Sequence, residues 1–427
     1  MTTTESDIGG AGSEAAASGG PLSGLRILEL GHFIAAPFCT RVLADLGADV
    51  IKVEPPGKGD PVRSWGMIPE GETDSVWWSV HGRNKRSITA DLKKPEGIAL
   101  VKRLIDRVDA VVENFKPGQL ASWGLGPQDM SAVNPDVILV QVSGYGQTGP
   151  GHNRAAFGVI GEAVGGLRHL TGYPKEVSDL PPVRTGISIG DSVAGLYGAI
   201  GLLAALFEKG RFEKGGERGR PGRRIDVALT ESILSLLEGC LPEYGATGKI
   251  RQPTGSTIPT TAPSNAYPTA DGRWFLIAAN SNALFRRLCG AMGRPELADD
   301  PRYIDNPSRV KHAAEVDAAI AHWTTGLTLD EVAAKVEAAD VPCSRIYDVA
   351  DIAADPQFLD RGMVRRVADP RLGEVLHPGI VPAMTGGPTG DVRWPGPEVG
   401  AHTDEVLSEL LGMAPDEIEA LKKEGVL

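Results

Sequence analysis

The sequence is short of cysteine and of metal-binding patterns. Its four cysteines are scattered and form no CxxC pair, and no histidine stands near them at metal-ligand spacing. The eight histidines likewise form no HxxxH or HExxH pattern. Disulfide frameworks and structural zinc sites depend on such spacings. We therefore expect reduced cysteines, no metal site and a cytoplasmic location.

Positive charge and long apolar runs are also scarce. The 43 Lys and Arg residues are outnumbered by 55 Asp and Glu residues, which gives a formal net charge of −12. An acidic chain is a poor partner for nucleic acid or an anionic membrane, because like charges repel. No uninterrupted apolar run reaches the ~18 residues of a membrane span. The most apolar stretch, residues 193–207, is short and rich in glycine. We expect no nucleic-acid or membrane partner.

From residue 25 onward, short β-rich segments alternate with longer helical patterns. This alternation predicts βαβ units, and therefore an α/β fold with a mostly parallel sheet. The predicted strands are residues 25–30, 49–54, 87–92, 109–114 and 136–143, and the predicted helices are residues 35–47, 95–107 and 118–125. Residues 223–239 add one more strand and helix.

The composition changes at both ends of this large domain. Residues 1–20 are a leader rich in Ser, Thr, Ala and Gly without the apolar core of a signal peptide, and we expect it to be disordered. Residues 241–265 are rich in Gly, Pro, Ser and Thr, which is typical of a connector. The predicted organisation is a large domain (21–240), a linker (241–265), a small α+β domain (266–350) and a C-terminal segment (351–427) that packs back on the large domain.

The stretch 185–209 is the strongest candidate for a site. We predict a strand over residues 185–189, a break at Gly190, and an apolar, buried helix that starts at Asp191. Glycines recur every three residues in that helix, so another backbone can approach it closely. Asp191 fits two interpretations: an N-cap that accepts hydrogen bonds from the first turn, or an ionised nucleophile at a helix start.

Two further motifs have competing interpretations. GYGQTG at residues 144–149 matches GxGxxG, but the following Pro-Gly continues a loop where a dinucleotide site needs a helix. GRNKRSITADLKK at residues 82–94 is strongly basic, which indicates either a solvated face or a phosphate-binding patch. ENFKPG at residues 113–118 follows its predicted strand at the carboxyl end, where parallel sheets bind ligands.

Together these motifs resemble the class III CoA-transferase family, the group of formyl-CoA transferase and carnitine CoA-transferase. The likeness is carried by HFIAAPFCTRVLADLGADVIKVEPPGKGDPVR, GRNKRSITADL, VENFKPGQL, VSGYGQTGP, GGLRHLTGYP and GISIGDSVAGLYGAIGLLAAL, and it covers residues 22–427. The resemblance implies a Rossmann-like large domain with a small domain, assembled as a homodimer of interlocked rings. It also implies an acyl-CoA and a carboxylic acid as substrates, with no tightly bound cofactor.

The resemblance also assigns site residues. The catalytic aspartate of the family falls on Asp191. The implied CoA-binding positions are Ile34, Ala35, Ala90, Asp91, Leu92, Lys93, Asn114, Phe115, Lys116, Ala155, Ala156, Phe157 and Gly158. Arg154, His169 and Arg184 are candidate contacts for the acceptor acid, because an arginine fork can hold a second carboxylate.

The sequence departs from formyl-CoA transferase at three places. Pro55 replaces a nucleotide-binding arginine, and Ile34 replaces an active-site glutamine. Gly255 and Ser256 stand near the place of a missing run of four glycines. Formate–oxalate specificity is therefore not expected. LRHLTGYP, RTGISIGDS and APSNAYPTADG instead resemble the subgroup that transfers CoA from succinyl-CoA to small dicarboxylic or hydroxy acids.

The expected chemistry is covalent: Asp191 forms a mixed anhydride and then an aspartyl-CoA thioester, so neither ATP nor a metal is needed. Three alternatives remain. An α-methylacyl-CoA racemase shares the fold but uses a histidine base where this chain has Phe157. The others are a non-catalytic CoA-binding protein and an NAD-dependent dehydrogenase.

Overall fold

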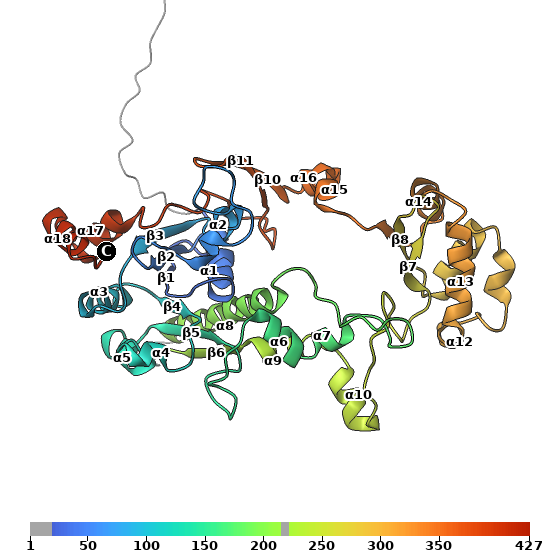
Figure 1. The fold of residues 1–427 in the computed structure, drawn as a ribbon, viewed down its shortest axis with the longest axis horizontal. Helices are drawn as coiled ribbons and strands as arrows, with labels where there is room; N and C mark the ends of the chain where they lie inside the picture. Colours follow the sequence, from blue (N-terminus) through green and yellow to red (C-terminus); the bar gives the residue numbers. More distant parts are fainter. Residues whose placement is uncertain (1–18, 215–221) are drawn as a thin grey trace, which may run out of the picture. The chain divides into compact units, whose positions relative to one another are not determined.

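The computed structural model describes residues 19–214 and 222–427 (Figure 1). These residues divide into two compact units, each treated by itself below. The first unit comprises the described residues up to Gly165, those of Ile187–Leu236 and Met363–Leu427, and the second comprises Gly166–Gly186 and Leu237–Gly362. The domain boundaries expected from the sequence stay a prediction. The leader, residues 1–20, lies almost entirely outside the described residues.

A six-stranded parallel sheet forms the centre of the first unit. Its strands are β1 (Arg26–Glu29), β2 (Asp49–Glu54), β3 (Lys85–Thr89), β4 (Ala110–Glu113), β5 (Ile138–Ser143) and β6 (Arg224–Ala228). They run in the order β3-β2-β1-β4-β5-β6, with every neighbouring pair parallel. This is the strand order of the doubly wound Rossmann fold, which reverses between β1 and β4. The predicted α/β class and mostly parallel sheet are confirmed.

Two apolar layers sandwich this sheet, because side chains alternate between its faces along each strand. Ile27 packs on one face with α1 (Ala35–Asp45) and α8 (Ile189–Lys214). The next residue, Leu28, packs on the opposite face. The helices of that second layer include α3 (Pro95–Ile105), α5 (Pro127–Val133), α17 (Thr403–Leu411) and α18 (Pro415–Lys423). The sheet is therefore covered on both sides.

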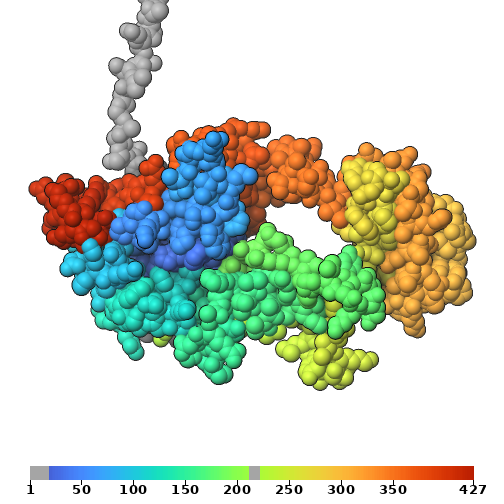
Figure 2. All heavy atoms as spheres, viewed as in Figure 1, coloured from blue at the N-terminus to red at the C-terminus, as the bar shows by residue number. Residues whose placement is uncertain are grey.

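Most of the C-terminal segment, Met363–Leu427, belongs to the first unit, whereas residues 351–362 belong to the second. In the space-filling view its red end lies against the blue segments that carry the early strands (Figure 2). The backbone N–H of Asp91 donates to the carbonyl of Val426 at 2.8 Å. Ser79 joins the hairpin of β10 (Val364–Asp369) and β11 (Gly373–Pro378), because its hydroxyl donates to Asp369 at 2.7 Å. The remaining short helices of this unit are η1 (Pro61–Ser64), α2 (Val76–His81), α4 (Gln119–Ser122), α6 (Gly158–Val164) and α9 (Leu229–Leu234).

The second unit contains a three-stranded antiparallel sheet and its own core. Its strands are β7 (Ser264–Pro268), β8 (Trp274–Ala278) and β9 (Cys343–Arg345). Its helices are α7 (Leu167–Leu170), α10 (Cys240–Thr247), α11 (Asn282–Ala291), η2 (Pro295–Asp299), α12 (Asn306–Lys311), α13 (Ala313–Thr324), α14 (Leu329–Ala338), α15 (Val349–Ala354) and α16 (Pro356–Asp360). Buried apolar side chains from α11, α13, α14 and the sheet form its core.

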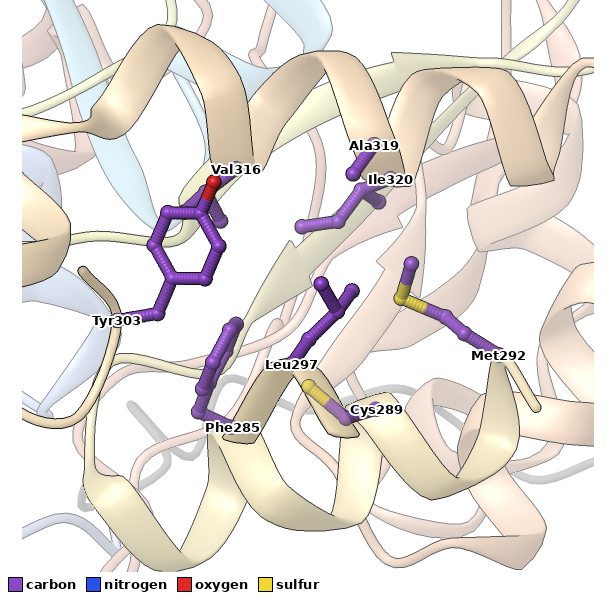
Figure 3. A pocket seen from close by; sticks show the side chains of 8 residues that line it. All are labelled: Phe285, Cys289, Met292, Leu297, Tyr303, Val316, Ala319 and Ile320. Carbon is purple, nitrogen blue, oxygen red and sulfur yellow. The ribbon is translucent and has the colours of Figure 1, made fainter. Parts of the chain in front are cut away.

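A small apolar cavity lies inside that core (Figure 3). It is lined by Phe285, Cys289, Met292, Leu297, Tyr303, Val316, Ala319 and Ile320, and its volume is about 10 Å³. A space of this size holds at most one water molecule, and an apolar cavity stays dry. The cavity is therefore a gap in the packing rather than a ligand site.

The prediction for residues 185–189 is wrong in two respects. These residues form no strand, and α8 begins at Ile189, so Asp191 lies within its first turn rather than at its start. Ser192 N–H already donates to the Ser188 carbonyl at 3.0 Å. The alternating β-branched residues have the sequence pattern of a strand, but a strand also needs a neighbouring strand with which to pair, and residues 185–189 have none.

The prediction that α8 is buried all round is also wrong for the single chain. Among the described residues, Ile189–Gly210 is the one helix long and apolar enough to cross a membrane by length and composition, a weak criterion that core helices also meet. One face of it packs on α1 and the sheet. The other face exposes Leu196, Tyr197, Ile200 and Phe207.

The first part of the basic run, residues 82–87, is not the solvated face or phosphate patch that its composition indicated, whereas Lys93 is exposed and Lys94 half-buried. Arg83 and Lys85 are fully buried, and Arg86 is 9% exposed. Arg83 pairs with Asp45 at 2.7 Å, and Lys85 pairs with Glu29 at 2.7 Å. These cations neutralise buried carboxylates, which a count of charges along the sequence cannot reveal.

Candidate active site

The candidate site lies at the carboxyl edge of the parallel sheet, where the strand order reverses between β1 and β4. Crevices at such a reversal are the usual ligand sites of doubly wound sheets. Here the loops after the two strands are joined: His32 N–H donates to Asn114 Oδ1, and Asn114 Nδ2 donates to the His32 carbonyl, both at 2.8 Å. Gly31 makes this contact possible, because a Cβ there would lie 2.7 Å from Asn114 Oδ1.

Glu113 fixes the start of the loop after β4. Its side chain is 2% exposed and accepts hydrogen bonds from Phe115 N–H and Gln141 Nε2, both at 2.7 Å. Burial raises the pKa of Glu113 to about 7, although these two hydrogen bonds oppose the shift. The Phe115 ring then lies edge-on between His32, at 5.3 Å, and Trp123, at 5.2 Å. Asn114 and Phe115 are therefore held rigidly at the edge of the sheet.

The loop after β1 is held by a second buried carboxylate. Asp60 Oδ1 accepts hydrogen bonds from Phe33 N–H at 3.1 Å and from Val62 N–H at 2.9 Å. Phe33 has a φ of 62°, and its ring lies 4.8 Å from Trp65 and 6.2 Å from Phe157. The turn leads directly into Ile34 and the start of α1.

Asp60 belongs to a cluster of buried charges under this turn. Lys52 Nζ lies 2.7 Å from Asp60 Oδ2 and 2.6 Å from Glu29 Oε1. Burial alone would raise the pKa of Asp60, but Lys52 and then His32 outweigh it and lower that pKa. The carboxylate therefore stays ionised as an acceptor for the backbone of the turn.

Asp191 reaches the same corner of the unit from α8. A Cβ on Gly158 would lie 2.0 Å from Asp191 Oδ2, so the carboxylate rests directly on the start of α6. Gly195, one turn further along α8, approaches α1 so closely that a Cβ there would lie 2.7 Å from the Ala35 carbonyl. The glycine spacing predicted this close approach, and it is confirmed. A carboxylate in the first turn of a helix is also favoured by the helix dipole.

The other sequence-predicted CoA positions line the same edge. Ile34, Ala35 and Ala90 are buried, Asp91 and Leu92 are half-buried, and Lys93 and Lys116 are exposed. Gly144 allows the loop after β5 to fold back closely on itself, because a Cβ on residue 144 would lie only 2.4 Å from the Ala156 Cβ. This loop carries no helix before Gly158, unlike the dinucleotide fingerprint that GYGQTG resembles. In it, Arg154, Ala155 and Phe157 are exposed and Ala156 is half-buried.

The two remaining candidates belong to the second unit. His169 Nε2 lies 3.1 Å from the Arg251 carbonyl, and Arg184 is exposed. The described residues contain no group of three or more His, Cys, Asp or Glu side chains that could hold a metal ion.

Sequence reasoning missed three residues of this corner: Phe33, Asp60 and Glu113. Each lies within a motif that the sequence analysis quoted, but none was given a role there. The conformation of Phe33 and the hydrogen bonds of the two carboxylates depend on tertiary structure. A buried acid directly after an apolar strand, as in Glu113, was the one usable signal.

The comparison with known proteins decides the family. The family model described as CoA-transferase family III matches residues 22–403. The chain belongs to this family of CoA-transferases. It is an enzyme of the transferase class, and the resemblance noted from the motifs is confirmed.

Individual relatives extend this result. A succinyl-CoA–D-citramalate CoA-transferase of Chloroflexus aurantiacus is 48% identical over 408 residues, which cover 95% of this chain and 98% of the relative. A succinate–glutarate CoA-transferase of Agrobacterium fabrum is 36% identical over 396 residues, or 91% and 96% of the two chains. The crystal structure of a CAIB/BAIF family protein from Brucella suis matches with a TM-score of 0.79 and 34% identity, covering 92% of this chain and 100% of that one.

Proposed function

We propose that this enzyme transfers CoA from succinyl-CoA to a small dicarboxylic or hydroxy acid, with Asp191 as the nucleophile. The observation that carries the proposal is the placement of Asp191, in the first turn of α8 and against Gly158, beside the loops that resemble the CoA-binding segments of the family. The relatives named for succinyl-CoA with citramalate, malate or glutarate support the choice of substrates.

The proposed reaction has two halves. In the first, the Asp191 carboxylate attacks the thioester carbonyl, the C–S bond breaks, and CoA leaves as a thiolate. The thiolate then attacks the aspartyl carbonyl of the resulting anhydride, which releases succinate and leaves an aspartyl-CoA thioester. Backbone N–H groups of the first turn of α8 are suited to stabilise the oxyanions.

In the second half, the acceptor carboxylate attacks the aspartyl thioester and again releases CoA thiolate. The thiolate attacks the acceptor acyl carbonyl of the new anhydride, which gives the product acyl-CoA and regenerates Asp191. The thioester bond energy is conserved throughout. Arg154, His169 and Arg184 are the proposed contacts of the second carboxylate of the acceptor. The racemase alternative is disfavoured because Phe157 occupies the position of its histidine base.

We further propose that the enzyme is an interlocked homodimer, formed by the large domain (21–240), the linker (241–265), the small domain (266–350) and the returning segment (351–427). The exposed apolar face of α8 supports this, because a second copy would remove Ile200 and Phe207, which are 59% and 68% exposed, from water. A cytoplasmic location is part of the same proposal.

The substrate assignment is tested by incubating the purified protein with succinyl-CoA and a panel of acids. We expect mass spectrometry to detect new CoA esters of dicarboxylic or hydroxy acids, such as citramalate, malate or glutarate, and none of their monocarboxylate analogues. Products only with monocarboxylates would contradict the assignment.

A further inference from the structure

Phe33 holds a backbone conformation that large side chains avoid. With a φ of 62° it is one of four non-glycine residues of the described chain in the left-handed region, and the only aromatic one. In this region the Cβ atom crowds the neighbouring carbonyl oxygen. Strain of this kind persists only where the surroundings enforce it, and it gathers at functional sites.

Asp60 enforces the conformation. Its Oδ1 accepts the Phe33 N–H, while Oδ2 is fixed by the fully buried Lys52 at 2.7 Å. Asn114 holds the preceding residue, His32, through both of its backbone groups. The turn is therefore held from both sides.

This conformation directs an aromatic ring to the corner where Asp191 lies. Phe33 packs against the buried cluster of Ile34, Val62 and Trp78. Its ring also contacts Trp65 and Phe157, which are 39% and 65% exposed, so the three rings form a partly open wall beside that cluster. Phe157 immediately precedes Gly158, the residue against which Asp191 rests. An apolar wall beside a carboxylate suits a ligand with an apolar segment next to an electrophilic carbonyl.

We propose that Phe33 contacts the apolar part of an acyl-CoA next to its thioester, and that Asp60 is the positioning residue that holds Phe33 for this contact. The inference rests on the proposed function in one respect, that the ligand is an acyl-CoA. It concerns residues to which neither the sequence motifs nor the proposed mechanism gives a role.

The test measures binding rather than turnover. Titration calorimetry with the full-length Asp191→Asn protein gives the Kd of succinyl-CoA without its consumption, and free CoA serves as the ligand that lacks the acyl group. We expect Phe33→Ala to raise the Kd of succinyl-CoA by about three- to tenfold, the range of an aromatic contact. The Kd of free CoA is expected to change less than about twofold by the same reasoning.

Three variants separate positioning from general stability. Asp60→Ala should reproduce the effect of Phe33→Ala. It should be less stable but still fold, because Lys52 keeps Glu29 as a partner at 2.6 Å. Asp60→Asn, which retains a carbonyl acceptor for the Phe33 N–H, should restore most of the affinity. Asp369→Asn is the control, since it alters an equally buried carboxylate that contacts Ser79 and Arg371 instead. It should leave both Kd values unchanged.

The strain itself is tested by denaturant unfolding. Phe33→Gly should unfold at a higher denaturant concentration than Phe33→Ala, because glycine adopts this φ without steric cost.

The binding measurements can overturn the inference in several ways. Phe33→Ala could weaken the binding of CoA and succinyl-CoA equally, or Asp369→Asn could weaken the binding of succinyl-CoA as much as Asp60→Ala does. An unchanged Kd in Phe33→Ala would overturn it while leaving the proposed function intact. If the Asp191→Asn protein without further changes bound no succinyl-CoA, both the inference and the proposed function would be overturned.

Discussion

Charged side chains inside the first unit are stabilised by partners rather than by solvent. Glu29 accepts from both Lys52 and Lys85, and all three side chains are fully buried. Burial lowers the pKa of Lys85 to about 8, against the attraction of Glu29. Removing one member of such a network leaves an unpaired buried charge, which typically costs about 3–5 kcal/mol. This explains why an NKRS run that looks like a binding patch is part of the interior.

His377 gives this unit a specific sensitivity to acid. Its Nε2 lies 3.0 Å from Ser79 Oγ, and burial, followed by the charge of Arg83, lowers its pKa to about 4. The unfolded chain binds a proton at His377 at a higher pH than the folded chain does. The stability contributed by the neutral form of His377 is therefore fully present above pH ~6.5. It should fall by about 3 kcal/mol as the pH drops toward 4.

Urea unfolding at several pH values checks this prediction against His377→Gln, which keeps an N–H donor but does not titrate. The difference in unfolding free energy between the two proteins should change only between these pH limits. A constant difference over the whole range would contradict it.

At the scale of elements, the sequence correctly predicted those strands whose apolar pattern is matched by a neighbouring strand in the sheet. The strands of the parallel sheet were predictable, because each is a short apolar run between turn and helix signals. Residues 185–189 carry the same pattern but pair with no strand, so local propensity misled there. The candidate site was predicted from Asp191, Asn114 and Phe115, whose roles stay predictions, whereas the φ of Phe33 is a property of the folded chain alone.

The contact between α8 and α1 gives a prediction at this scale. Gly195→Ala should destabilise the protein by about 1–3 kcal/mol, because the new Cβ would meet the Ala35 backbone carbonyl. Gly290→Ala in α11 is the matched control, since a Cβ there meets nothing within 4 Å. It should be neutral or stabilise by up to about 1 kcal/mol. Equal effects in thermal or urea unfolding would show that the close packing of α8 on α1 is not energetically important.

At the scale of the whole molecule, both units expose large apolar side chains. Besides the outer face of α8, Leu241, Tyr244 and Ile250 of the second unit are more than half exposed. Contiguous exposed apolar surface commonly marks an interface, and within the first unit the outer face of α8 is such a surface. The proposed interlocked dimer would cover it and could not separate without unfolding.

Analytical ultracentrifugation tests the assembly. We expect a species of twice the 45.0 kDa chain mass that persists at nanomolar concentration. A folded monomer under these conditions would refute interlocking. A slow exchange of subunits between labelled and unlabelled dimers would likewise argue for an ordinary, separable interface.

The central claim is that the Asp191 carboxylate becomes covalently bonded during transfer. If Asp191 only stabilised the first turn of α8, Asp191→Asn would cost about 0.3–1 kcal/mol of stability and leave turnover intact. If it is the nucleophile, Asn and Ala variants should be folded and inactive, because neither an amide nor a methyl group can form the anhydride.

The most direct measurement is mass spectrometry of the wild-type protein incubated with succinyl-CoA alone. The account predicts an acyl or CoA adduct that hydroxylamine intercepts or borohydride reduces, and peptide mapping should place it on Asp191. An adduct on another residue, or a fully active Asp191→Asn protein, would contradict the account.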